Sequence, residues 1–317
     1  MKTFMRIIFM GTPAFAVESL KVLHASKHEV VAVITSVDKP AGRGRKLNQS
    51  EVKQFALEAG LPILQPAKLK DEDFLKEIIS LSADLFVVVA FRMLPEVLWS
   101  LPKLGTFNLH SSLLPNYRGA APINWAIVNG EKKTGVTTFF INENIDTGEI
   151  LLQAETDIAA DEDAGSLHDR LMLIGAELVL KTANALEKGE LKPKAQSEVH
   201  DRREAPKIFK DDLRINLKDS TEHIYNLIRG MSPFPGAWTM AQAKGEEKSL
   251  KIFASEILED IPLSEAGKIE ILNKNQIILH LKDGVLNLKA LQIEGKRRMN
   301  AQDFINGRIL EEGAKIV

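Results

Sequence analysis

The sequence contains no cysteine among its 317 residues. Disulfides and thiolate metal sites are therefore excluded. It also has no apolar run near the roughly 20 residues that a helix needs to cross a bilayer. The short apolar stretch at the N-terminus, MKTFMRIIFMG, lacks a cleavage site of small residues, so we interpret it as a first strand. We expect a cytoplasmic protein that does not enter a membrane.

An excess of charge of either sign is also lacking, since the net charge is -2. This balance argues against a generic nucleic-acid binder. Basic residues nevertheless gather in two places. Residues 38–53 contain five basic and two acidic side chains, and residues 294–298 contain three basic and one acidic. Such clusters are most often solvated faces, but they also fit the docking of one phosphate-rich partner.

The first half of the chain alternates strand and helix patterns. We expect strands over 6–11, 29–36, 62–66, 84–90, 105–110, 134–141 and 149–158, and helices over 14–26, 51–60, 71–82 and 164–188. Asp71 is a plausible cap for the third helix. Strands that alternate with helices predict an open, mostly parallel α/β sheet of Rossmann-like type. We assign this domain to residues 1–190.

The pattern changes beyond residue 190. Residues 191–207 are polar and charged and carry two prolines, so we interpret them as a linker. Short strands are then expected over 250–258, 268–273, 276–281 and 285–293. Asp283-Gly284 is a hairpin signal, and Asn300 is expected to cap a last helix. The sequence predicts a small C-terminal β-barrel over residues 208–317.

Polar side chains end two of the predicted strands. Asn108 and His110 lie two residues apart on one strand, so both point to the same face, and Leu109 points to the other. They lie at the carboxyl end of the strand, where open α/β sheets bind ligands. Asp146 follows another strand and lies in Asp146-Thr147-Gly148, a turn that could return over the same edge.

These three groups suit attack by a nucleophile on a carbonyl carbon. A carboxylate helps an imidazole take a proton, and an amide NH₂ donates to an oxygen that becomes negative. Neither a cysteine nor a G-x-S-x-G elbow accompanies them, which favours direct transfer between two substrates over a covalent enzyme intermediate. From residue types and spacing alone, a structural role for the Asn and the His stays open.

A longer motif set, with its order and spacing, narrows the choice. It comprises Asn108-x-His110, Ser112-Leu113-Leu114-Pro115, Arg118-Gly119, Ala121-Pro122 and Asp146-Thr147-Gly148. This set resembles the folate-dependent formyltransferases. The resemblance implies that Asn108, His110 and Asp146 form the catalytic site. It also implies a reduced-folate pocket lined by Ser112, Leu113, Leu114 and Pro115, 10-formyltetrahydrofolate as donor, and no metal.

Other stretches resemble the members of this family that formylate methionyl-initiator-tRNA. They are Gly11-Thr12-Pro13 followed by Phe15, the basic loop over 38–47, Ser232 to Trp238, and 295–302. The resemblance implies a monomer with a barrel of oligonucleotide-binding type, whose loop 38–47 enters the tRNA acceptor stem. The implied tRNA-binding residues are Arg43, Arg45, Lys46, Lys207, Lys296, Arg297 and Arg298. One departure lies at 87–95, where Arg92 stands at a position that is commonly Gly.

The residue types and their spacing are also compatible with three other functions. A formyltransferase with a small acceptor would have no use for Arg43 or for 296–298. A hydrolase would release formate from the same donor. A nucleotide- or RNA-binding protein could be built on the first strand–helix unit, although Gly11-Thr12-Pro13 lacks the G-x-G-x-x-G pattern.

Overall fold

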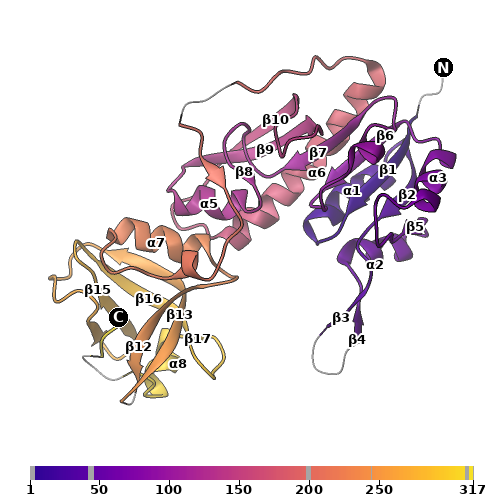
Figure 1. Cartoon of the computed structure of the whole chain (residues 1–317). Coiled ribbons are helices and arrows are strands. Elements are labelled where there is room, and N and C mark those ends of the chain that lie inside the picture. The colour runs from indigo at the N-terminus through magenta and orange to yellow at the C-terminus, as the bar shows by residue number, and fades with distance from the viewer. Residues whose placement is uncertain (1–3, 42–45, 198–200, 244, 311–313, 317) are drawn as a thin grey trace. The chain divides into compact units, whose positions relative to one another are not determined.

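The structure is a computed structural model that describes all residues except 1–3, 42–45, 198–200, 244, 311–313 and 317 (Figure 1). The chain divides into two compact units. The N-terminal unit comprises residues 1–119, 134–156 and 168–204, and the C-terminal unit comprises 120–133, 157–167 and 205–317. The two units therefore interleave along the sequence.

A seven-stranded sheet forms the centre of the N-terminal unit, in the order β10-β9-β7-β6-β1-β2-β5. The strands are β1 (Arg6–Gly11), β2 (Glu29–Ile34), β5 (Ile63–Leu64), β6 (Leu85–Val89), β7 (Thr106–His110), β9 (Lys133–Phe140) and β10 (Ile150–Asp157). Strand β1 pairs in parallel with β2 and β6, and β6 pairs in parallel with β7. The direction reverses at β9, which runs antiparallel to β7. The expected open, mostly parallel sheet is confirmed.

Helices cover both faces of this sheet (Figure 1). They are α1 (Phe15–His24), α2 (Glu51–Glu58), α3 (Glu72–Ser80), α4 (Glu96–Trp99) and α6 (Ala164–Lys188). The predicted cap is confirmed, because the side chain of Asp71 accepts a hydrogen bond from the backbone N–H of Phe74. Phe74 and Ile78 of α3 pack in one buried cluster with Phe86 and Val88 of the sheet. In the part of the chain that the structure describes, no helix is long and apolar enough to span a membrane.

Two parts of the basic stretch over 38–50 form strands that the sequence does not suggest. Strands β3 (Lys39–Ala41) and β4 (Lys46–Asn48) pair antiparallel, with Lys39 opposite Asn48. These strands are short and β3 contains a proline, so no alternation of polar and apolar residues marks them. Where the sequence predicts a polar loop, the structure has a pair of short strands.

The C-terminal unit is a closed antiparallel sheet with helices against it. Strands β12 (Ala237–Ala243), β13 (Glu246–Leu258), β16 (Val285–Ile293), β15 (Gln276–His280) and β14 (Ile269–Leu272) follow one another in space, and β17 (Met299–Asn300) pairs with β16. Residues 314–316 close the sheet: Ile316 bridges Ala241 of β12, and Lys315 bridges Lys268 beside β14. This closure supports the expected small barrel, and its buried interior includes Leu250, Leu288 and Phe304.

The helices of this unit are α5 (Pro122–Val128), a short 3₁₀ turn (Asp211–Leu213), α7 (Thr221–Gly230) and α8 (Ala301–Asn306). Asn300 caps α8 as predicted, because its side chain accepts from the N–H of Asp303 at 2.8 Å. The predicted hairpin at Asp283-Gly284 joins β15 and β16. Helix α7 and strand β12 were not predicted from the sequence, and their apolar residues complete the same buried core.

A buried histidine ties the start of β1 to α6 in the N-terminal unit. The Nδ1 of His28 accepts from the backbone N–H of Met5 at 3.3 Å, so the other ring nitrogen carries the proton and donates to Oδ1 of Asn184 at 3.1 Å. Burial is the main cause that lowers the pKa of His28 from 6.5, against the opposing effects of Asn184 and Glu187. The folded state therefore favours the neutral ring.

This histidine predicts a loss of stability in mild acid. Because the pKa is lower in the folded state, the unfolded chain binds the proton first, and stability falls as pH drops below 6.5. Replacing His28 with Asn, whose side-chain oxygen can accept from Met5, should flatten that part of the curve. Urea denaturation of both proteins at a series of pH values measures it. Identical pH dependence in the two proteins would contradict the assignment.

Candidate active site and nucleic-acid interface

Strand β7 presents its two polar side chains to one face of the sheet. Leu109, between them, points to the other face and packs against Gly175 of α6. Its Cδ2 lies 2.7 Å from the position that a Cβ on Gly175 would occupy. Asn108 lies opposite Val88 of β6 and so shares the face of Val88. Asn108 is half-buried, and its side-chain amide makes no hydrogen bond to any residue in the described ranges.

The ring of His110 is buried and is held by a backbone carbonyl. Its Nε2 lies 2.7 Å from the carbonyl oxygen of Tyr117. A carbonyl only accepts, so Nε2 carries the hydrogen and, in the neutral ring, Nδ1 keeps the lone pair. Nδ1 lies 3.7 Å from Oδ2 of Asp146, which is ion-pair distance and longer than a hydrogen bond.

The backbone of Tyr117 is itself constrained. Its φ is 60°, a left-handed conformation that is unusual for a residue of this size. The N–H of Tyr117 donates to the carbonyl of Arg203 at 2.6 Å, and the Arg203 guanidinium donates to the Tyr117 hydroxyl at 3.2 Å. Arg203 was assigned to a linker from the sequence, but it supports the carbonyl that orients His110.

Asp146 reaches the site from the turn after β9. Its Oδ2 accepts from the N–H of Gly119 at 2.9 Å. Its φ is 54°, which Asp tolerates better than most residues. Position 148 of the same turn must be a glycine, because a Cβ there would lie 1.6 Å from the carbonyl oxygen of Phe140. The structure thus brings His110 and Asp146 together, as expected from the sequence.

Arg118, next to Gly119, is half-buried. Its Nε donates to the side-chain oxygen of Gln196 at 3.0 Å. Burial is the largest cause that lowers the pKa of Arg118 below its ordinary value, and the positive charge of Arg202 adds to it. Gln196, like Arg203, lies in the segment interpreted as a linker. No sequence motif marks either residue.

The expected folate loop, Ser112 to Pro115, is held by one buried threonine. The hydroxyl of Thr137 donates to the carbonyl of Ser112 at 2.6 Å, and it accepts from the N–H of Leu114 and from the amide of Gln153. The hydroxyl of Ser112 is buried and donates to the carbonyl of Asn116. The side chain of Leu113 lies against Gly135. Backbone and side chain of this loop are therefore both anchored.

Arg92, at the position that departs from the family pattern, is exposed. Its guanidinium donates to the carbonyls of Ala67, at 3.1 Å, and Pro66. It also lies over the ring of Phe91, 5.6 Å from the centroid.

The predicted tRNA-binding residues fall into three groups. Arg43 and Arg45 lie outside the described residues, and for Lys46 only the backbone, in β4, is described. Lys207 is exposed, with its Nζ 5.6 Å from the ring centroid of Phe209. The third group follows β16, and its exposed members are Lys296, Arg297 and Arg298.

Cations of the C-terminal unit stack on aromatic rings. The guanidinium of Arg298 lies 4.4 Å from the ring centroid of Phe253. Lys210 and Arg214 both lie over Trp238, at 5.1 Å and 5.6 Å. Such pairs present positive charge beside a π-face, a combination typical of nucleic-acid surfaces. Arg214 does not belong to the set of tRNA-binding residues predicted from the sequence.

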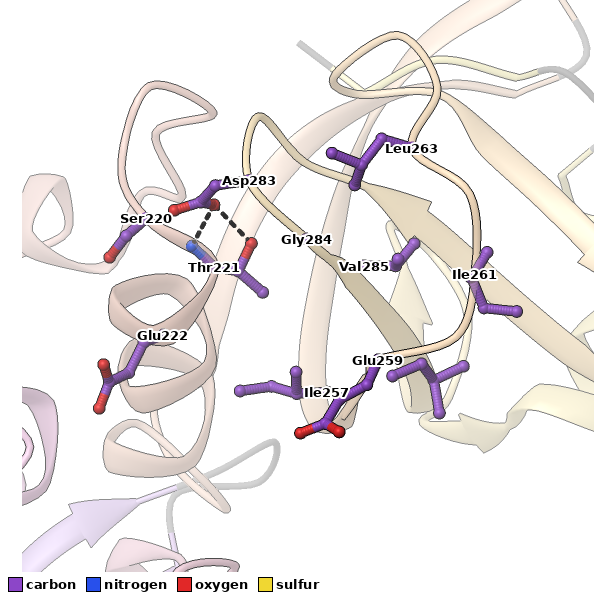
Figure 2. Close-up of a pocket in the computed structure, with 11 residues that line it drawn as sticks. Ser220, Thr221, Glu222, Ile257, Glu259, Ile261, Leu263, Asp283, Gly284 and Val285 are labelled. Atoms are coloured by element: carbon purple, nitrogen blue, oxygen red, sulfur yellow. Dashed lines mark hydrogen bonds between the residues drawn. The ribbon is translucent and has the colours of Figure 1, made fainter.

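A separate groove of about 540 Å³ lies in the C-terminal unit, between the start of α7 and strands β13 and β16 (Figure 2). Its carboxylate Asp283 accepts from the N–H and the hydroxyl of Thr221, at 2.9 and 2.7 Å. These hydrogen bonds are the main causes that lower the pKa of Asp283. That carboxylate thus anchors the start of α7, and none of the predicted site residues lines the groove.

A Rossmann-like sheet that has an amide and an imidazole on one face of β7 and a carboxylate 3.7 Å from the imidazole, followed along the chain by a small antiparallel barrel, indicates a two-domain group-transfer enzyme. The family described as formyl transferase matches residues 5–182, and its C-terminal domain matches residues 207–308. The chain belongs to the formyl transferase family.

Curated relatives match almost end to end. The methionyl-tRNA formyltransferase of Flavobacterium johnsoniae is 50% identical over 98% of this chain and 99% of its own length. That of Bacteroides thetaiotaomicron is 47% identical over 98% of each chain. A crystal structure of a sugar 3N-formyl transferase with dTDP and 5-N-formyl-THF shares the fold, with a TM-score of 0.66 and 22% identity over 92% of this chain and 99% of that one.

The anchoring of the 112–115 loop gives a stability prediction. Replacing Thr137 with Val leaves the N–H of Leu114 and the carbonyl of Ser112 without their partner in a buried place, at a cost of about 1–3 kcal/mol. The control is Thr134 to Val, because Thr134 is also buried on β9 but its hydroxyl has no hydrogen-bond partner among the described residues. Urea denaturation compares the two. Equal losses of unfolding free energy would contradict the anchoring role.

Proposed function

We propose that this protein transfers the formyl group of 10-formyltetrahydrofolate to the free amino group of methionyl-initiator-tRNA, which yields formylmethionyl-tRNA for translation initiation. The observation that carries the proposal is the 50% identity to a methionyl-tRNA formyltransferase over 98% of this chain. A folate-type co-substrate agrees with the related crystal structure that contains 5-N-formyl-THF.

We assign the proton transfer to the pair of His110 and Asp146. The attacking amine must lose a proton as its nitrogen bonds to the formyl carbon. Nδ1 of His110 keeps the lone pair because Nε2 is engaged with Tyr117, and Oδ2 of Asp146 is 3.7 Å from Nδ1. A proton taken up at Nδ1 is therefore stabilised by the carboxylate at the moment of transfer.

We assign the stabilisation of the developing oxyanion to Asn108. Its half-buried amide, on the same strand face as His110, has an NH₂ group that can donate to the formyl oxygen as the carbon becomes tetrahedral. Collapse of this intermediate breaks the bond between the carbon and N10 of the folate, and the proton removed from the amine is returned to N10. The proposal includes no metal ion.

Binding is divided between the two parts of the chain. Residues 1–190 act as the catalytic domain, with Ser112, Leu113, Leu114 and Pro115 along the folate. Residues 208–317 act as the tRNA-binding domain, joined by 191–207. The tRNA contacts, on the acceptor stem, are Arg43, Arg45, Lys46, Lys207, Lys296, Arg297 and Arg298. The protein works as a monomer in the cytoplasm.

The direct test measures transfer of labelled formyl from 10-formyltetrahydrofolate to methionyl-tRNA by the purified protein. Loss of one oxyanion donor lowers kcat by about 10²–10³-fold, so Asn108 to Ala should do so while the protein stays folded. Fast formate release without tRNA would instead indicate a hydrolase. Equal turnover of Asn108 to Ala and the parent protein would contradict the role of the amide.

A second test addresses the tRNA surface. Replacing Lys296 and Arg297 with Ala, which leaves Arg298 on Phe253, should raise KM for methionyl-tRNA and keep kcat. The slope of log KM against log salt should fall by about one for each phosphate that the variant no longer neutralises. Lys274 to Ala, an exposed cation of the same unit, is the control. An unchanged salt slope in the double variant would argue for a small acceptor.

A further inference from the structure

One glutamine joins the two loops that carry the site in the N-terminal unit. The side-chain amide of Gln196 donates from Nε2 to the backbone carbonyl of Asp146 at 2.9 Å and to that of Gly148 at 2.8 Å. Its Oε1 accepts from Nε of Arg118 at 3.0 Å and also from Nη2. Both hydrogens of the NH₂ group and the oxygen are therefore engaged.

These bonds act on the residue whose carboxylate faces His110. Asp146 is held from two sides, because its backbone carbonyl accepts from Gln196 and its Oδ2 accepts from the N–H of Gly119. Gly119 directly follows Arg118, the other partner of Gln196. The glutamine thus closes a ring of contacts that includes the 118–119 segment and the 146–148 turn.

The turn needs such support because its conformation is costly. Asp146 has a φ of 54°, and a residue in this left-handed region persists only where its surroundings constrain it. A shift of the turn would change the separation of 3.7 Å between Nδ1 of His110 and Oδ2 of Asp146. A misplacement of about 1 Å at a reacting group can cost about 10²-fold in rate.

We propose that Gln196 is a positioning residue that sets the Asp146 carboxylate against the His110 ring. It acts through Asp146 and does not touch the substrates. The inference rests on the proposed function only for its kinetic consequences, since the hydrogen bonds and their effect on the turn exist without substrate.

Two variants distinguish the hydrogen bonds that Gln196 donates to the 146–148 turn from those that it accepts from Arg118. Gln196 to Met keeps the length of the side chain and removes every hydrogen bond. Gln196 to Glu keeps an acceptor for Arg118 but removes both donors, and it places a negative charge against two carbonyls. The control is Lys192 to Met, an exposed residue of the same segment. We expect kcat to fall about 10²-fold in both Gln196 variants, with KM for both substrates within about twofold of the control.

A double-mutant cycle tests the route of the effect. If Gln196 acts through Asp146, then Gln196 to Met should add less than about a threefold loss to a protein that already carries Asp146 to Asn. A further loss as large as in the parent background would overturn the proposal. So would a kcat in either single Gln196 variant within about threefold of Lys192 to Met.

Hydrogen exchange supplies a readout that does not depend on activity. The N–H of Gly119 is bonded by the Asp146 carboxylate, so its exchange should quicken by about tenfold or more in Gln196 to Met and Gln196 to Glu but not in Lys192 to Met. Unchanged exchange would overturn the positioning role. A parent protein that forms no formylmethionyl-tRNA would overturn the proposed function, while the exchange result would still decide the role of Gln196.

Discussion

The hydrogen bond from Nε2–H of His110 to the carbonyl of Tyr117 decides which ring nitrogen faces Asp146. A backbone carbonyl accepts at every pH, so it selects one tautomer without adding a charge. The lone pair of the neutral ring then lies toward the carboxylate. The same carbonyl depends on a left-handed Tyr117, and that conformation is held in turn by Arg203. The backbone conformation at Tyr117 therefore determines which nitrogen of His110 can accept a proton.

The site is assembled from three chain segments that satisfy one another's polar groups. Residues 108–119 supply the imidazole and a backbone donor, 146–148 supply the carboxylate, and the third segment supplies Gln196 and Arg203. A loop that is partly buried must find hydrogen-bond partners for its backbone, and here other loops provide them. Because each loop depends on the others, a change in one is expected to reach the pair of His110 and Asp146.

Several elements could be predicted because their signals are local. The apolar, mostly β-branched run at 30–34 and the caps Asp71 and Asn300 act within a few residues, and the structure has each of them. Other elements could not. Strand β12 is stabilised by the core of the barrel, and residues 314–316 become a closing strand only because they pair with Ala241 and Lys268. Such pairings leave no periodic pattern in a single sequence.

The sequence by itself determined the α/β alternation, the placement of Asn108 and His110 on one strand face, and the motif set of a formyltransferase. Strand geometry explains this, since alternation of side chains is a property of the local backbone. Only the tertiary structure decided the tautomer of His110, the 3.7 Å separation from Asp146 and the involvement of Gln196. The bond from Gln196 to Asp146 joins residues 50 positions apart, and such contacts exist only once the segments have packed together.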